Sequence, residues 1–226
     1  MIKYNNSTIN DWNFDDSNIK KVYYNNDVCY QKITNETPPL PYDAEIEYLE
    51  NNITDGSQYI NTNQYLNPNS FEIGYEINSP QIYWGYVHQG IGYGTWIGIE
   101  NNTVFFGNYD NNRFTATTSS TENVVIYAKS GVTINGNSYT SKSFSLGTDR
   151  INSIPLYIFG RYDFNQHNID TNASAKLKSF YLKVNDELVL DLIPVRVGQV
   201  GYMYDKISGQ LFGNVGTGNF ILGADK

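Results

Sequence analysis

The chain has 226 residues, a formal net charge of −8, and only 17% charged residues. It is long enough for one large β domain, or for a β-sandwich with an appendage. The acidic balance argues against a nucleic-acid partner, which needs clustered Lys and Arg, and no apolar run reaches the roughly 18 residues of a membrane span. The composition includes 20 Tyr, 11 Phe and 19 Gly. Because aromatic residues favour strands and Gly favours turns, we expect an all-β protein.

The first part of the chain, residues 1–36, predicts a small β segment. Residues 8–14, residues 19–24 and a third stretch ending near Ile33 favour strands, with turn-forming residues between them. A piece of this size cannot bury a core of its own, yet it carries many large side chains. We interpret it as an attachment segment that docks on a partner; the alternative is that it packs on the rest of the chain. The candidate anchoring residues are Trp12, Phe14, Tyr23, Tyr24 and Tyr30.

Residues 37–41 contain three prolines and predict a stiff linker, because proline cannot continue a sheet. This linker is the expected domain boundary. The N-terminal residues 1–6 lack the apolar stretch of a signal peptide, so we expect synthesis in a cytoplasm. The single cysteine, Cys29, excludes an internal disulfide.

Residues 42–226 contain short strand candidates at the spacing of an antiparallel β-sandwich. Residues 71–77 alternate between apolar and polar positions, which predicts one buried face and one solvated face. The pair Asn135 and Gly136 predicts a tight hairpin, and residues 184–188 join two alternating runs in the same way. Further strands are expected at residues 44–49, 58–62, 82–87, 96–100, 103–108, 123–128, 132–134, 156–159, 177–184 and 188–193.

The most specific stretches of this second part are residues 42–50, 55–62, 178–184, 188–196, 201–214 and 216–218. Together they resemble the laminin-G-like, concanavalin-type jelly-roll modules of gut (crAss-like) bacteriophage virion proteins and of surface proteins from their bacterial hosts. The resemblance covers residues 42–226 and is strongest in the last fifty. Residues 22–33 are similar to a short module that precedes such domains in phage structural proteins.

The resemblance implies a non-enzymatic virion surface appendage, either a head fibre or a tail-associated protein. Residues 1–36 would attach it to other capsid or tail proteins, and residues 42–226 would face outward and bind a host-surface polysaccharide. Fibres of this type are commonly homotrimers, so a trimer is the implied oligomer. Two alternatives remain: a bacterial surface lectin-like domain that binds carbohydrate, and a glycanase.

Aromatic residues crowd the region of residues 82–99 and suggest where a glycan would bind. Aromatic rings stack on sugar rings, so Trp84, Tyr86 and Tyr93 are the candidate glycan-binding residues. A pair of core strands would contain the same residues, however, because buried aromatics dominate core packing.

An active site has little support in the sequence. Glycoside hydrolysis needs two carboxylates across a cleft, and Glu45 and Glu47 share a strand face while Glu50 falls on the other. We interpret Glu45 and Glu47 as the solvated side of an edge strand. The two histidines, His88 and His167, lie far apart and match no nucleophile or metal-ligand spacing. We therefore expect no catalytic residues and no cofactor.

Calcium is an open question that comes from the resemblance, since many laminin-G-like modules hold Ca²⁺ at a loop rim. Asp163, Asn165 and Asp170 would be its ligands here, in an oxygen-rich stretch. The stretch fulfils no complete ligand motif, and such clusters arise easily in an Asn-rich chain.

Overall fold

The computed structural model consists of two compact units, Met1–Pro39 and Leu40–Lys226, which divide inside the predicted linker. Every secondary-structure element among its described residues is a strand. No helix among the described residues is long and apolar enough to cross a membrane. The described residues are 2–4, 7–9, 21–24, 27–31, 39–52, 54, 57–66, 70–78, 87–88, 95–100, 103–108, 112–128, 130–139, 155–163, 168–170 and 175–226.

The described residues of the first unit form two antiparallel hairpins. One pairs β1 (Ile2–Tyr4) with β2 (Ser7–Ile9), and the other pairs β3 (Lys21–Tyr24) with β4 (Asp27–Gln31). The strands β3 and β4 follow the two predicted strands closely. They carry three of the candidate anchoring residues, whereas Trp12 and Phe14 lie outside the described residues. The three that the hairpin carries are Tyr23, Tyr24 and Tyr30.

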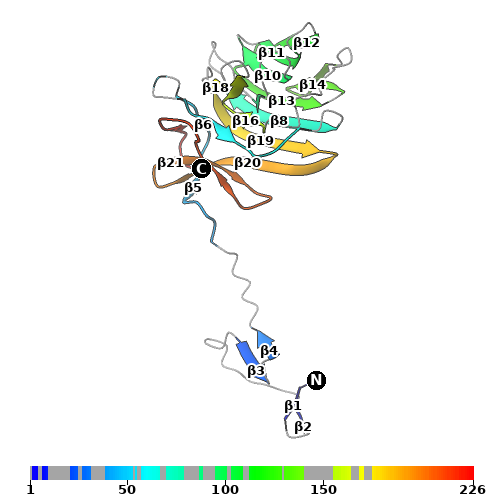
Figure 1. Ribbon diagram of the computed structural model, residues 1–226, viewed down its shortest axis with the longest axis vertical. Coiled ribbons are helices and arrows are strands. Elements are labelled where there is room, and N and C mark those ends of the chain that lie inside the picture. The colour runs from blue at the N-terminus through cyan, green and yellow to red at the C-terminus, as the bar shows by residue number, and fades with distance from the viewer. Residues whose placement is uncertain are drawn as a thin grey trace. The chain divides into compact units, whose positions relative to one another are not determined.

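The second unit is built on one large antiparallel sheet, in which β8, β19 and β20 run side by side (Figure 1). Three short strands, β5 (Ala44–Glu45), β6 (Leu49–Glu50) and β23 (Ile221–Leu222), pair at its ends. The main strand order is β15 (Asn137–Tyr139), β14 (Gly131–Ile134), β13 (Glu122–Ala128), β8 (Phe71–Asn78), β19 (Lys176–Val184), β20 (Glu187–Val197), β21 (Val200–Asp205) and β22 (Leu211–Phe212).

Smaller sheets provide the second layer of the sandwich. Residues of β7, β16 and β12 join the same hydrophobic cluster as the inward residues of the large sheet, so the core lies between the two layers. The smaller sheets are β7 (Ile60–Asn61) with β16 (Tyr157–Ile158) and β9 (Val87–His88); β10 (Thr95–Glu100) with β11 (Thr103–Asn108) and β12 (Asn112–Thr117); and β17 (Arg161–Asp163) with β18 (Asn168–Asp170).

Strand β8 shows why these residues form a sandwich. Phe71, Ile73, Tyr75 and Ile77 are buried, and the residues between them, Gly74 apart, are partly exposed, as the alternation predicts. The buried Tyr75 hydroxyl lies 2.9 Å from the Tyr127 hydroxyl, which satisfies a polar group inside the core. The predicted all-β antiparallel sandwich with a small N-terminal β segment is confirmed.

Both predicted hairpins are present. Asn135 and Gly136 have φ values of 50° and 81° between β14 and β15, and Asn185 and Asp186 have 53° and 63° between β19 and β20. Positive φ at both central residues is the requirement of a two-residue type I′ turn. Asn, Asp and Gly tolerate this backbone better than other residues, so the local sequence dictates the turn.

Three expectations about strands need correction. Residues 44–49 form two short strands rather than one, because β5 pairs with β20 whereas β6 pairs with β19 and β23, so the chain changes partners between them. The strands β12, β17 and β18 were not expected, and β17 is separate from β16, which lies within the predicted strand at residues 156–159. Each of the three begins or ends at Asn or Asp, which have low strand propensity, and pairing with neighbouring strands overrides it.

The glycine-rich C-terminal stretch closes the sandwich against its own beginning. The Val215 amide donates to the Tyr59 carbonyl, and Asn214 Oδ1 accepts from the Tyr59 amide. A Cβ on Gly216 would lie 1.6 Å from the Ser57 carbonyl oxygen, so only glycine permits this approach. This contact gives a physical role to one of the motifs that carry the family resemblance.

Candidate functional site

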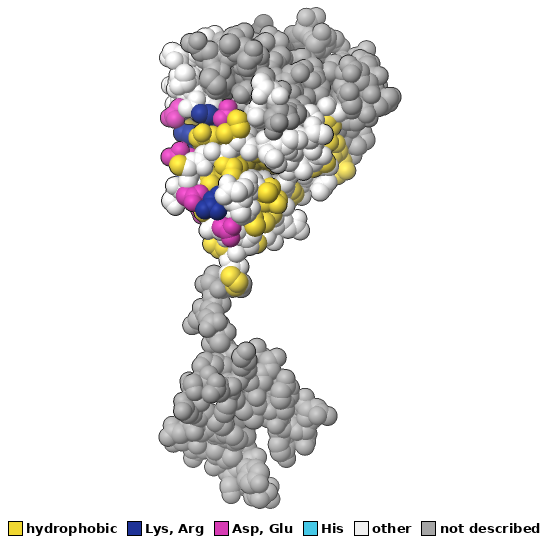
Figure 2. All heavy atoms as spheres, turned by 90° about the vertical axis from the view of Figure 1, so that its left-hand side faces the viewer, with side chains coloured by type: hydrophobic (Ala, Val, Ile, Leu, Met, Phe, Trp, Pro, Cys, Tyr) yellow, Lys and Arg dark blue, Asp and Glu magenta, His cyan; other side chains and the backbone are white. Residues whose placement is uncertain are grey.

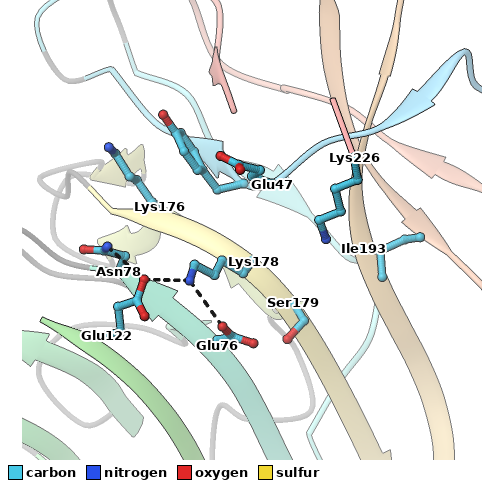
Figure 3. A pocket seen from close by; sticks show the side chains of 10 residues that line it. Glu47, Glu76, Asn78, Glu122, Lys176, Lys178, Ser179, Ile193 and Lys226 are labelled. Atoms are coloured by element: carbon cyan, nitrogen blue, oxygen red, sulfur yellow. Dashed lines mark hydrogen bonds and ion pairs between the residues drawn. The ribbon is translucent and has the colours of Figure 1, made fainter. Parts of the chain in front are cut away.

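A cavity of about 570 Å³ opens on the outer, solvated face of the large sheet (Figure 3). Its floor comes from β8, β13 and β19, and its wall comes from the segment after β5 and from the end of the chain. Charged and polar side chains dominate the lining. They are Glu47, Glu76, Glu122, Lys176, Lys178, Lys226, Tyr48, Asn78 and Ser179, with Ile193 as the apolar member.

Strand register brings the floor residues together. Asn78 of β8 is opposite Glu122 of β13 on one side and Lys176 of β19 on the other. One pleat along, Glu76 is opposite Ser179. These positions alternate with the buried ones, so all of them point to the solvated face.

A β-bulge directs Lys178 into the site. The register between β19 and β8 shifts between Leu177 and Ser179, which leaves Lys178 as an extra residue of the strand. Leu177 is buried, whereas Lys178 and Ser179 are both partly exposed on the outer face. Bulges of this kind re-aim a side chain and are frequent next to functional sites.

Lys178 is held between two carboxylates. Its Nζ lies 2.8 Å from Glu122 Oε1 and 3.4 Å from Glu76 Oε1, and Asn78 Nδ2 donates to Glu122 at 3.4 Å. Figure 3 shows the ammonium between the two glutamates. The hydrogen bond with Glu122 raises the pKa of Lys178, and the same bond lowers the pKa of Glu122. Lys178 and Glu122 are therefore both charged at neutral pH.

The wall of the cavity depends on the two ends of the second unit lying together. The Glu47 amide donates to the Ala224 carbonyl at 2.8 Å, and the Lys226 amide donates to the Glu45 carbonyl at 3.0 Å. Lys176 Nζ lies 4.6 Å from the centroid of the Tyr48 ring, a cation–π distance. In Figure 3 the Lys226 side chain reaches into the cavity beside Ile193.

The lining can bind a ligand with many hydroxyl groups. A hydroxyl donates and accepts, so neighbouring hydroxyls can bond to an ammonium and a carboxylate at the same time. Tyr48 and Ile193 add apolar surface at the sides. A few placed polar groups beside apolar ones are typical of small-molecule sites.

The candidate glycan-binding residues from the sequence are not among the described residues. Trp84, Tyr86 and Tyr93 all lie outside them, so a glycan site there stays a prediction. Of the edge-strand glutamates, Glu45 and Glu47 are exposed, as expected, but Glu47 also lines the cavity. His88 lies in β9, and His167 is outside the described residues.

The calcium candidates occupy paired strands. Asp163 of β17 is opposite Asn168, and Asp170 of β18 is opposite Arg161, so the two aspartates lie at opposite ends of this ribbon. Asn165 is outside the described residues. Within the described part of the chain, no three His, Cys, Asp or Glu residues are placed to hold a metal. The calcium site stays a prediction.

The cavity residues were missed because the sequence does not reveal strand order. The alternation of residues 71–77 predicted that Glu76 faces solvent, which is confirmed. The charged residues of β13 and β19 become a site only through pairing across more than forty positions of the chain.

Along one side of the sandwich, Figure 2 shows Lys and Arg side chains next to Asp and Glu side chains, close to hydrophobic ones.

Comparison with known proteins supports the fold. No family model matches the chain, and no curated protein matches it. Among solved structures, the chain is similar to a proposed carbohydrate-binding protein from Bacteroides ovatus ATCC 8483, with a TM-score of 0.54 and 14% identity. The match covers 80% of this chain and 61% of that one, so this chain spans less than two thirds of its length. At this identity the likeness shows a common fold alone.

Proposed function

We propose that the second unit is a non-enzymatic carbohydrate-binding domain, and that its glycan occupies the cavity around Lys178. The observation that carries the proposal is the bulged lysine between two carboxylates on an open sheet face. The fold shared with a proposed carbohydrate-binding protein agrees with it. The likeness agrees with the lectin-like alternative from the sequence more closely than with a virion surface appendage that binds glycan.

Affinity electrophoresis through gels that contain soluble β-glucan, mannan, starch or polygalacturonate tests the binding. Retardation by one of these polysaccharides is the expected result for the full chain. The variant Lys178→Ala should lose most of the retardation, since a hydrogen bond to a charged group contributes about tenfold or more in affinity. Lys21→Ala is the matched control, because it removes the same charge from β3 of the first unit, which contributes no residue to the cavity lining. If none of these polysaccharides retards the full chain, the proposal is wrong.

The same site argues against glycoside hydrolysis. A general acid needs a carboxyl with a raised pKa, whereas the hydrogen bond from Lys178 lowers the pKa of Glu122. Incubation with the retained polysaccharide should therefore release no reducing ends. Release that disappears in the Glu76→Gln, Glu122→Gln double variant would show that the protein is a glycanase.

We also propose that the first unit attaches the domain to a larger assembly, with a bacteriophage virion as the implied setting. Two-stranded hairpins are marginally stable alone, and β3 and β4 carry three large aromatic residues in nine positions. A partner surface that buries Tyr23, Tyr24 and Tyr30 would stabilise them. Mass spectrometry of purified particles and the oligomeric state of the full chain test this role. A monomeric chain found in the host envelope and absent from particles would contradict it.

A further inference from the structure

Beside the cavity, the ring of Tyr181 lies on Gly74. The two residues are register partners in β19 and β8, and a Cβ on Gly74 would lie 2.1 Å from Tyr181 Cε1. The ring therefore occupies the space of the missing side chain. The phenol donates to Glu72 Oε1 at 2.9 Å, and Lys183 Nζ donates to the same oxygen at 2.7 Å. These contacts hold an aromatic ring along the outer sheet face.

This aromatic platform continues the floor of the cavity. Gly74 and Glu76 both face outward on β8, two residues apart, which is about 7 Å at the rise of an antiparallel strand. From Asn78 at the far side of the cavity to Glu72 beyond the platform, the strand extends about 20 Å. The surface is therefore longer than one sugar ring requires.

The charges along this surface are balanced. Three glutamates and three lysines line the cavity. At the platform, Lys183 pairs with Glu72, and beside it Lys206 pairs with Asp191, the neighbour of Tyr181 on β20. An anionic glycan would meet carboxylates beside Lys178 and Lys183, and the whole chain repels it with its net charge of −8. An uncharged glycan is not repelled in this way.

We propose that the ligand is a chain of uncharged sugars that starts in the cavity, follows β8 and β19, and stacks one ring on Tyr181. The apolar face of a pyranose fits a flat aromatic ring, and the cavity binds the hydroxyls of the sugars before it. This inference rests on the proposed function and adds the class and the length of the ligand.

Calorimetric titration of the full chain with cello-, manno- and malto-oligosaccharides of one to six sugars tests the length. In one of the three oligosaccharide series, the longer ligands should bind about tenfold more tightly than the shortest ligand that binds. Beyond a certain length the affinity should rise no further. Tyr181→Ala should remove this rise and leave the affinity of the shortest ligand unchanged. Tyr181→Phe keeps the ring and should retain most of the rise. Polygalacturonate oligomers of equal length should bind at least tenfold more weakly.

Two further variants separate binding from folding. Gly74→Ala retains the tyrosine but forces its ring off the strand, so it should also reduce the rise with length. Tyr139→Ala alters a tyrosine at the far edge of the same sheet, on β15, and should bind as the unaltered chain does. An affinity independent of length, or unaffected by Tyr181→Ala, overturns the inference but leaves the proposed function standing. Tighter binding of polygalacturonate overturns the uncharged class, and no binding of any oligosaccharide or polysaccharide overturns both proposals.

Discussion

Arg196 and Asp225 form a two-point ion pair, with Nε 2.7 Å from Oδ1 and Nη2 2.6 Å from Oδ2. The same guanidinium donates to the Gly198 carbonyl at 3.1 Å and lies 3.9 Å from Asp43. Asp43 is at the beginning of the second unit and Asp225 is near its end. One arginine thus joins the two segments that form the wall of the cavity.

The first prediction concerns this junction. Arg196→Lys keeps the charge but loses the planar two-point geometry. The Glu47 and Lys226 amides, which bond to the facing segment, should exchange their hydrogens faster. Hydrogen exchange followed by mass spectrometry measures this, with the buried strand β19 as the internal reference. Equal exchange in both proteins would show that the backbone bonds alone hold the wall.

A second prediction concerns Gly216. An alanine Cβ there meets the Ser57 carbonyl, a backbone atom that cannot rotate away, so Gly216→Ala should destabilise the domain by roughly 1–3 kcal/mol. Gly213→Ala is the matched control, because its Cβ meets only the Tyr202 ring, at 3.0 Å. Denaturant unfolding compares the two. A loss of the same size in both variants would mean that the Ser57 approach has no special cost.

Local patterns in the sequence predicted local structure well. The two type I′ turns followed from residue pairs that tolerate positive φ, and the faces of β8 followed from its alternation. What failed was the assignment of residues 44–49 to one strand. Two apolar residues there, Ile46 and Leu49, are fully buried, but the segment between the strands turns to reach different partners. Only tertiary pairing decides such a break.

The site was harder to predict than the fold for a related reason. No sequence motif links Lys178 to Glu122, and their interaction requires both the strand order β13-β8-β19 and the bulge in β19. Aromatic rings stack on sugars, so the sequence favours Trp84, Tyr86 and Tyr93 as the sugar-binding residues. Tyr181 was placed only within a strand, because its contact with Gly74 is a cross-strand contact that the sequence does not reveal.

The third prediction concerns stability in acid and Asp205, whose side chain is 1% exposed. Burial opposes its ionisation, but hydrogen bonds from the Asp191 amide and from Ser208 outweigh this and lower its pKa. Because the pKa of Asp205 is lower in the folded chain than its unfolded value of about 3.9, the ionised side chain stabilises the fold at pH values above about 3.9. This contribution is lost as the pH falls below that value. The melting temperature should thus be level from pH 7 to about pH 5 and fall below about pH 4.

Asp205→Asn should lower the melting temperature at neutral pH and flatten its decline in acid, because the amide does not titrate. Asp186→Asn, in the exposed turn after β19, is the control and should keep the profile of the unaltered chain. Thermal melts followed by circular dichroism in a pH series measure both. An undiminished acid decline in Asp205→Asn would assign the effect to other carboxyl groups.

The last prediction concerns the independence of the two units. The second unit contains a complete core, in which Leu182, Leu192 and Phe180 are at most 1% exposed. The described residues of the first unit form two short hairpins, and two-stranded hairpins are marginally stable alone. Deletion of residues 1–36 should therefore change the melting temperature of the second unit by no more than a degree or two, because all the described core residues of that unit remain.

The truncated chain should also keep its binding to polysaccharide and lose its capacity to join a larger assembly, which gel electrophoresis and sedimentation measure separately. Tyr24→Ala in the full chain should weaken assembly in the same direction, because removal of a large side chain from an interface costs about 1 kcal/mol or more. Tyr65→Ala, in the second unit and 48% exposed, is its control. If the truncation unfolds the sandwich, the hairpins of the first unit are part of the domain itself and do not serve as its attachment segment.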